Sequence, residues 1–227
     1  VMSLLGGRAS VLLGDYWLVK AIDNVLVNKT SSSEVIKVFS RTLADLAEGE
    51  ILQLQKADLG DTAENDYYRI IFNKTASLFV TSAESAAISV SASAEKMKAV
   101  KSYAEYLGIA FQIRDDIFDY EENPDTGKPV GLDLKEKKIT LPLLGALKNA
   151  SEEEAKDIRR KVCRIDEHPE WQKEIVEFVH RNGGLEYARK RLYEYVERAK
   201  LSLRPLGKSE DADKLADIAE FTADRKS

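Results

Sequence analysis

The stretch Gly108-Ile-Ala-Phe-Gln-Ile-Arg-Asp-Asp-Ile-Phe-Asp-Tyr120 carries three aspartates in an otherwise largely apolar run. They are Asp115, Asp116 and Asp119, and this spacing brings them to one side of a helix. Because a helix turns by roughly 100° per residue, these carboxylates and Gln112 fall within an arc of about 100°. Aliphatic and aromatic side chains occupy much of the opposite side. The stretch therefore predicts a long amphipathic helix with an acidic face, around which the rest of the chain packs.

Three carboxylates on one helix face repel one another unless a cation neutralises them. Mg²⁺ suits such a face, because it is held by one or two carboxylates while water and phosphate oxygens fill its other positions. We therefore predict Asp115, Asp116 and Asp119 as ligands of Mg²⁺ that bridges to a diphosphate. The alternative is a solvated acidic face, a common feature in a chain of which 32% is charged. One DDxxD pattern does not decide between the two.

Length and composition indicate an ordinary globular protein. The chain has 227 residues, 44% of them hydrophobic, and a net charge of −5, so it can bury a substantial core and has no basic excess for nucleic-acid binding. The single Cys163 excludes an internal disulfide and fits a reducing compartment, which we expect to be the cytoplasm. No apolar run reaches the roughly 18 residues of a membrane span.

The positions of prolines and of helix-capping patterns along the chain predict an all-α fold. All five prolines follow residue 123, so nothing interrupts long helices in the first half. Capping patterns occur at Ser31 with Glu34, Asp61 with Glu64, and Ser151 with Glu154. We expect helices that end near residue 57 and that cover 68–90, 94–121 and 139–149, with a loop at 123–138. We expect residues 1–227 to form a single-domain helical bundle.

Lysines flank the acidic stretch on both sides. Lys74 and Thr75 lie about 40 residues upstream of Asp115. Lys128 and Lys138 bracket the loop that follows Asp119. Ammonium groups beside carboxylates that need a metal are expected where the ligand is itself polyanionic, since metal and lysines can then share its phosphate oxygens. The alternative is that these lysines form ordinary surface ion pairs.

Five blocks in this order resemble the trans-type isoprenyl (polyprenyl) diphosphate synthases. The blocks are Val11-Leu-Leu-Gly-Asp-Tyr16, Glu48-Gly-Glu-Ile-Leu-Gln53, Tyr68 through Lys74-Thr-Ala76, Leu107 through Asp119, and Gly127-Lys-Pro-Val-Gly-Leu-Asp-Leu-Lys-Glu-Lys-Lys-Ile-Thr-Leu-Pro142. The resemblance implies an all-helical fold around a deep central cavity, usually in a homodimer. It also implies head-to-tail prenyl transfer, in which an allylic diphosphate ionises and the double bond of isopentenyl diphosphate attacks the resulting cation.

The resemblance assigns roles to individual residues. Asp115, Asp116 and Asp119 match the second aspartate-rich motif, with Asp115 foremost as a Mg²⁺ ligand. The remaining matches concern the substrates. By the resemblance, Lys74 and Lys128 hold the allylic diphosphate, and Thr75 and Gln112 face the allylic cation. Phe111 and Gln112 contact isopentenyl diphosphate or the reacting carbons, and Lys138 lies near the closing loop. Glu50 stands where short-chain members often have glutamine. A lipophilic product would also bring the protein into peripheral contact with a membrane.

The chain departs from the family pattern at its beginning. Family members carry a first DDxxD motif upstream of these blocks, whereas the blocks begin here almost at Val1. The sequence opens without a start methionine or a signal-peptide pattern, so we expect the natural protein to extend upstream. A protein that truly began at Val1 would have half of its Mg²⁺ site and should be inactive. Product length, which depends on residues near the first motif, is not predicted.

Four alternatives compete with prenyl chain elongation. A class I terpene cyclase would need a second metal motif. The nearest candidate begins at Asn65-Asp66, but Arg69 and Asn73 stand where this motif requires Ser/Thr and Glu. A squalene- or phytoene-synthase-like enzyme could use Asp115 and Asp119, but it leaves the block at 127–142 unexplained. A non-catalytic subunit that regulates a catalytic partner would fit the missing first motif. A plain helical scaffold would bind no Mg²⁺-dependent diphosphate.

Overall fold

The computed structural model describes residues 2–27, 32–121 and 130–225, and within these ranges it contains helices and short connections but no β-strand. This confirms the predicted all-α fold. The elements are α1 (Met2–Val27), α2 (Ser32–Leu59), α3 (Glu64–Ile71), a π-helix (Phe72–Ala76), α4 (Ser77–Ser89), α5 (Ala94–Phe118), α6 (Leu132–Lys135), α7 (Leu141–Asn149), α8 (Glu152–Cys163), α9 (Trp171–Arg181), α10 (Gly184–Ser202), a 3₁₀ turn (Arg204–Leu206) and α11 (Glu210–Asp224).

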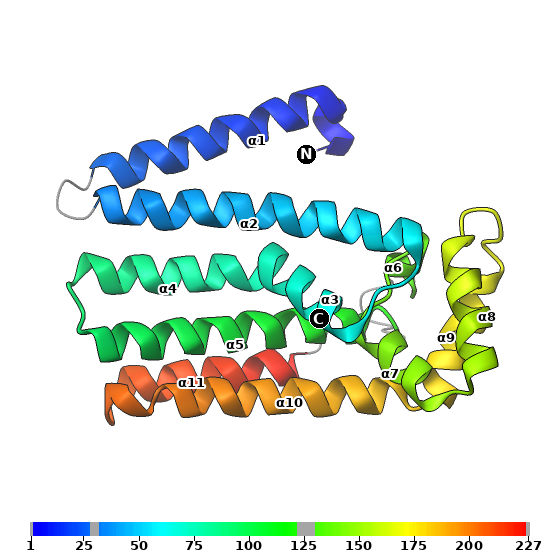
Figure 1. Cartoon of the computed structure of the whole chain (residues 1–227). Coiled ribbons are helices and arrows are strands. Elements are labelled where there is room, and N and C mark those ends of the chain that lie inside the picture. Colours follow the sequence, from blue (N-terminus) through cyan, green and yellow to red (C-terminus); the bar gives the residue numbers. More distant parts are fainter. Residues whose placement is uncertain (1, 28–31, 122–129, 226–227) are drawn as a thin grey trace.

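The acidic stretch forms the C-terminal half of α5, and α5 lies in the middle of the bundle (Figure 1). Its main neighbours are α4 on one side and α10 on the other, while α11 runs along both α5 and α10. The chain alternates direction from α2 to α4, α5 and α10, and α7, α8 and α9 close one end (Figure 1). The end of α11 and Arg225 thereby return to the end of α5 that carries the aspartates.

Two glycines allow α2 and α5 to approach the π-helix from either side. A Cβ on Gly49 would lie 2.7 Å from Cβ of Asn73, and a Cβ on Gly108 would lie 2.6 Å from Cα of Ala76. The space beside Gly108 on α5 is therefore filled by the backbone of the π-helix. The close packing fixes Lys74 and Thr75 against both neighbouring helices.

The π-helix is the main departure from the predicted helices. Residues 68–90 were expected to form one helix, but the backbone widens at Phe72–Ala76, which contains Lys74 and Thr75. Such π segments inside α-helices occur frequently at functional sites. The Ser151 cap is confirmed, since its Oγ accepts the backbone N–H of Glu154 at 3.3 Å.

Other predicted features differ or cannot be placed. At the start of α3 the expected pair of Asp61 and Glu64 is replaced by the side chain of Asp66, which accepts the N–H of Ala63 at 3.0 Å. Ser31, most of the loop after α5, and with it Lys128, lie outside the described residues.

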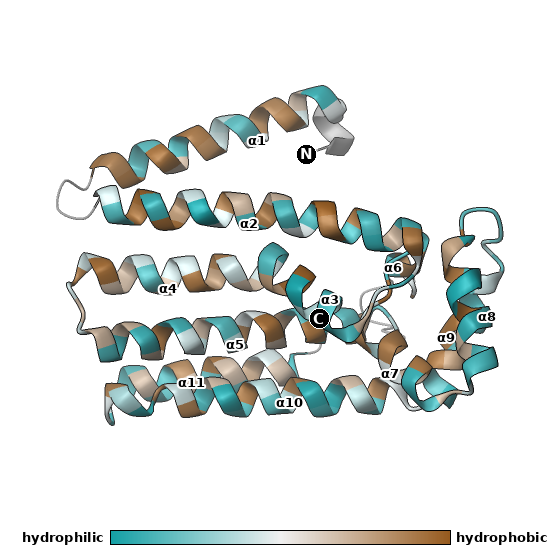
Figure 2. Cartoon of the chain, viewed as in Figure 1, coloured by the Kyte–Doolittle hydropathy of each residue, from teal (hydrophilic) through white to brown (hydrophobic). Residues whose placement is uncertain are grey.

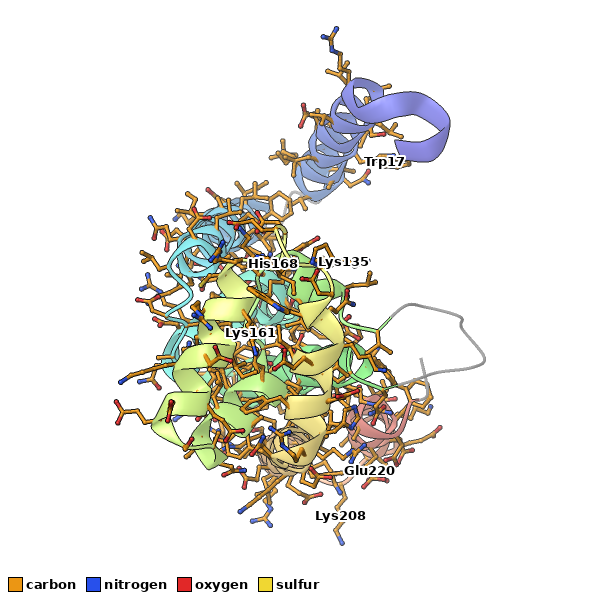
Figure 3. All side chains as sticks on the ribbon, turned by 90° about the vertical axis from the view of Figure 1, so that its right-hand side faces the viewer. Trp17, Lys135, Lys161, His168, Lys208 and Glu220 are labelled. Atoms are coloured by element: carbon orange, nitrogen blue, oxygen red, sulfur yellow. The ribbon has the colours of Figure 1, made fainter. Side chains whose placement is uncertain are left out.

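Helix α1 stands apart from the rest of the molecule. It contacts α2 and diverges from it along its length, and Trp17 lies far from the main body (Figures 1 and 3). Figure 2 shows several hydrophobic positions along α1. Across the described ranges, no helix combines the length and the apolar character required to cross a bilayer.

Candidate functional site

A cavity of about 190 Å³ lies where α2, α3, the π-helix and α5 meet the segment that leads into α7. Five of the residues singled out from the sequence line it, namely Lys74, Thr75, Gln112, Asp116 and Lys138. Phe111, Asp115 and Asp119 belong to the same end of α5 but are not among its walls. The residues predicted from three separate blocks therefore meet at one place.

A chain of hydrogen bonds crosses the cavity wall. The hydroxyl of Tyr67 donates to Oδ2 of Asp116 at 2.6 Å, and Nε2 of Gln112 donates to Oδ1 of the same carboxylate at 2.9 Å. Oε1 of Gln112 in turn accepts the hydroxyl of Thr75 at 2.7 Å. Both oxygens of Asp116 are thus engaged inside the protein, and only 3% of the residue is exposed.

Burial, followed by the charge of the nearby Asp133 carboxylate, raises the pKa of Asp116 to about 8. The hydrogen bonds from Tyr67 and Gln112 act in the opposite direction, because they favour the charged form. Asp116 is thus a buried acid whose charge is costly in the absence of a cation. A cation in the adjoining cavity would favour its ionised form.

Asp119 fixes the return of the chain after the loop. Its two carboxylate oxygens accept the backbone N–H groups of Leu132 and Asp133 at 2.8 and 3.1 Å, and its carbonyl accepts the N–H of Gly131 at 2.7 Å. Burial, followed by the charge of Asp133, raises the pKa of Asp119 to about 6. Asp119 therefore anchors the segment that brings Asp133 and Lys138 to the cavity.

Asp115 points toward the C-terminus, where its Oδ1 forms an ion pair with Arg225. The Arg225 guanidinium also donates to the carbonyl of Phe111 at 3.1 Å and lies 4.0 Å from the centre of the Phe111 ring. Arg114 donates to the carbonyl of Arg225 at 2.9 and 3.2 Å, which holds this end of the chain on α5. The Asp115 side chain is 39% exposed, so it remains accessible from solvent.

Lysines also line the cavity. Nζ of Lys74 lies 2.5 Å from a carboxylate oxygen of Glu50 and donates to Oε1 of Gln53 at 2.9 Å. Nζ of Lys138 lies 3.2 Å from Asp133 and 2.6 Å from Glu136. Burial lowers the pKa of Lys138, but its bonds to these carboxylates outweigh burial and raise the pKa overall.

The three aspartates therefore face different partners. Within the ranges that the structure describes, no group of three or more His, Cys, Asp or Glu residues is placed to hold a metal ion. The donor set does fit an ion that arrives with a diphosphate, because such an ion needs only one or two carboxylates from the protein. Among the three aspartates, Asp115 fits this role on two grounds, being partly exposed and already facing a cationic side chain.

Three residues of the site were missed in the sequence. Asp133 lies within the block at 127–142, and its position among lysines was a usable signal. Tyr67 immediately precedes the block that begins at Tyr68, but nothing in the sequence connects it to Asp116. Arg225 is separated by 110 residues from Asp115, and only the fold brings the two together.

Comparisons with known proteins agree on one family. Residues 1–179 match the family model described as polyprenyl synthetase. The chain is 36% identical over 219 residues to an all-trans-nonaprenyl-diphosphate synthase (geranyl-diphosphate specific) of Rhodobacter capsulatus, covering 96% of this chain and 66% of that protein. It is 34% identical to octaprenyl diphosphate synthase of Escherichia coli, covering 97% of this chain and 68% of that protein.

Solved structures show the same fold. A polyprenyl synthase from Caulobacter crescentus, complexed with calcium and isoprenyl diphosphate, superposes with a TM-score of 0.89 at 31% identity and covers all of this chain and 69% of its own. A geranylgeranyl pyrophosphate synthase from Bacteroides thetaiotaomicron has a TM-score of 0.88 at 33% identity and covers 99% of this chain and 74% of its own. The chain thus spans 66% of the length of the first curated relatives that it matches.

Proposed function

Because the chain belongs to the polyprenyl synthetase family, we propose that its protein condenses isopentenyl diphosphate with an allylic diphosphate to make a polyprenyl diphosphate. The observation that carries the proposal is the cavity. Lys74 and Lys138 from separate segments meet the Thr75–Gln112–Asp116 chain there, in a protein whose sequence matches the family over most of its length. Cationic and hydrogen-bonding groups around one polar cavity are suited to a diphosphate.

The lysines would bind the diphosphate of the allylic substrate. Lys74 currently pairs with Glu50 and Gln53, and Lys138 with Asp133 and Glu136, so each ammonium is already oriented at the cavity wall. A diphosphate carries more charge than these carboxylates, and it can displace them as partners. Preorganised cations of this kind stabilise the charge that develops on a leaving group.

Mg²⁺ would be held by Asp115, with the diphosphate supplying further oxygens. When bound, the ion neutralises charge on the departing diphosphate. Arg225 is the cation that faces Asp115 in this structure, and the metal would replace it as the partner of the carboxylate. Asp116 and Asp119 keep their internal hydrogen bonds in this arrangement. They would therefore hold the surrounding side chains and backbone of the site in place.

Thr75 and Gln112 would face the reacting carbons. The Thr75 hydroxyl donates to Gln112, so a lone pair of its oxygen is left to face positive charge. Phe111 lies beside Gln112 on α5 and packs on Phe79 at a ring separation of 5.6 Å, which supplies an apolar surface next to the polar groups. Apolar walls exclude water that would quench a carbocation.

The test is incorporation of labelled isopentenyl diphosphate by the full-length protein, with several allylic diphosphates as primers and Mg²⁺ present. Chain-elongated products that disappear with a chelator would support the proposal. If products formed only after a second, catalytic subunit was added, the chain would be a regulatory subunit. If none formed and no diphosphate bound, the prenyltransferase proposal would fail.

We further propose that the protein is a homodimer that uses α1. The exposed fractions of Leu12 and Trp17 are 68% and 65%, and Val11, Tyr16 and Val19 are also exposed on this helix. Contiguous exposed apolar side chains commonly mark an interaction surface. Sedimentation at micromolar concentration should show a dimer that Trp17→Glu weakens, whereas a strictly monomeric wild type would contradict the proposal. We place the protein in the cytoplasm, in peripheral contact with membrane through its product.

A further inference from the structure

Tyr67 is a buried residue of the cavity wall to which the proposed chemistry assigns no role. Only 3% of it is exposed, and its hydroxyl donates to Asp116 across 49 positions of the sequence. Its ring lies 5.4 Å from that of Tyr68, which packs in turn at 5.6 Å on Tyr195 of α10. These contacts fix the position of the Tyr67 hydroxyl independently of any ligand.

The carboxylate of Asp116 lies between the Tyr67 hydroxyl and the Gln112 amide and accepts a hydrogen bond from each. Gln112 has two bonded ends, since its oxygen accepts from Thr75 and its nitrogen donates to Asp116. If the amide turned over while Asp116 is ionised, its oxygen would face an oxygen of the carboxylate, and two acceptors would oppose each other. A carboxylate held in one rotamer therefore selects one orientation of the amide.

We propose that Tyr67 is a positioning residue that holds Asp116 so that Asp116 fixes the Gln112 side-chain amide against Thr75. The value of this arrangement for catalysis rests on the proposed function, because there Gln112 and Thr75 face the reacting carbons. A misplacement of such groups by about 1 Å can lower turnover by as much as roughly 100-fold.

The chain offers a matched control in Tyr103. This tyrosine is also buried, with 5% exposed, and its hydroxyl donates one hydrogen bond of 2.7 Å to the carbonyl of Leu215, away from the cavity. Tyr67→Phe and Tyr103→Phe each remove one buried hydroxyl and one hydrogen bond. A purely structural role for Tyr67 would therefore give the two variants similar properties.

The first measurement needs no ligand and no activity. Hydrogen exchange of the Gln112 side-chain amide, followed by NMR in the unliganded protein, should be about fivefold faster in Tyr67→Phe than in wild type, as expected for a weakened hydrogen bond. Asp116→Asn should accelerate it as well, and Tyr103→Phe should leave it unchanged. Equal exchange in wild type and Tyr67→Phe would overturn the proposal, whether or not the protein proves to be a prenyltransferase.

The second measurement separates turnover from binding in the full-length protein. Tyr67→Phe should lower kcat by about tenfold or more with little change in KM, while Tyr103→Phe retains the wild-type kcat. Since Tyr67 acts through Gln112, adding Tyr67→Phe to Gln112→Ala should cause little further loss. Additive losses would show that Tyr67 acts elsewhere. A wild type without turnover would refute the proposed function, and the exchange measurement would still decide the positioning role.

Discussion

The cavity end of α5 and helix α1 differ in which kind of side chain they bury. At the cavity, polar side chains are buried, and Asp116 satisfies both of its oxygens with partners from the same chain. On α1, apolar side chains such as Leu12 and Trp17 remain exposed. Buried polar groups are costly unless bonded, and exposed apolar surface is costly unless covered. The cavity is therefore assembled within this chain, whereas the apolar face of α1 needs another surface to cover it.

The comparison predicts that substitutions at the cavity end of α5 lower activity or stability, while substitutions on α1 leave activity unchanged and do not destabilise a single chain. The largest effect is expected at Asp115. In the full-length protein Asp115→Ala should lower turnover by roughly 10²–10³, as removal of a catalytic electrostatic group of ~3–4 kcal/mol does. Circular dichroism should show an intact helical fold. Turnover at the wild-type level would remove Asp115 from the metal site.

A second prediction compares one glycine from each region. Gly108→Ala should lower the free energy of unfolding by about 1–3 kcal/mol, because its methyl group would meet the backbone of Ala76. Gly14→Ala on α1 meets nothing within 4 Å and should stabilise the helix by about 0.5–1 kcal/mol. Urea unfolding of both variants measures the difference. Equal effects would show that α5 does not approach the π-helix this closely.

A third prediction concerns pH. The pKa of Asp116 is raised to about 8 in the folded protein, so the folded state holds a proton that the unfolded state loses above its ordinary pKa near 4. Its contribution to stability is present below pH 4 and is lost as the pH rises toward 8. In metal-free buffer, Asp116→Asn should flatten this decline of the urea midpoint. An unchanged decline would assign it to other groups, with Asp119 the next candidate.

The smallest effect is expected for Lys74, which shares its role with other lysines. Lys74→Ala should weaken binding of an allylic diphosphate about tenfold, which corresponds to the lower end, about 1.5 kcal/mol, of what a hydrogen bond to a charged group contributes. Lys20, which pairs with Asp23 on the exposed surface of α1, provides the control, and Lys20→Ala should not change the affinity. If calorimetry gave the same dissociation constant for wild type and Lys74→Ala, Lys74 would form only an ordinary ion pair and would not bind the diphosphate.

The sequence predicted the local parts of this structure well. The all-α class, the helical acidic stretch and the Ser151 cap depend on spacing and on neighbouring residues, and the structure confirms them. The predicted residues at Lys74, Gln112 and Lys138 also meet in one cavity. Spacing was sufficient for the helices, whereas the roles of Lys74, Gln112 and Lys138 came from the ordered blocks that resemble the family.

What the sequence did not predict depends on tertiary contacts. The π-helix at Phe72–Ala76 forms where Gly49 and Gly108 let two helices close in, and no local signal marks it. The helical projection placed the three aspartates on one face, but the fold gives each a different partner. Tyr67 and Arg225 reach them from 49 and 110 positions away, a pairing that helical periodicity alone cannot predict.

The central claim is that the cavity and the adjoining end of α5, which carries Asp115, together bind a diphosphate with Mg²⁺. Calorimetric titration of inorganic pyrophosphate into the wild-type protein tests it most directly, once with Mg²⁺ and once with a chelator. We predict saturable binding with Mg²⁺, lost with the chelator and weakened by Asp115→Ala. Binding that is the same in both buffers, or absent from both, would contradict the claim.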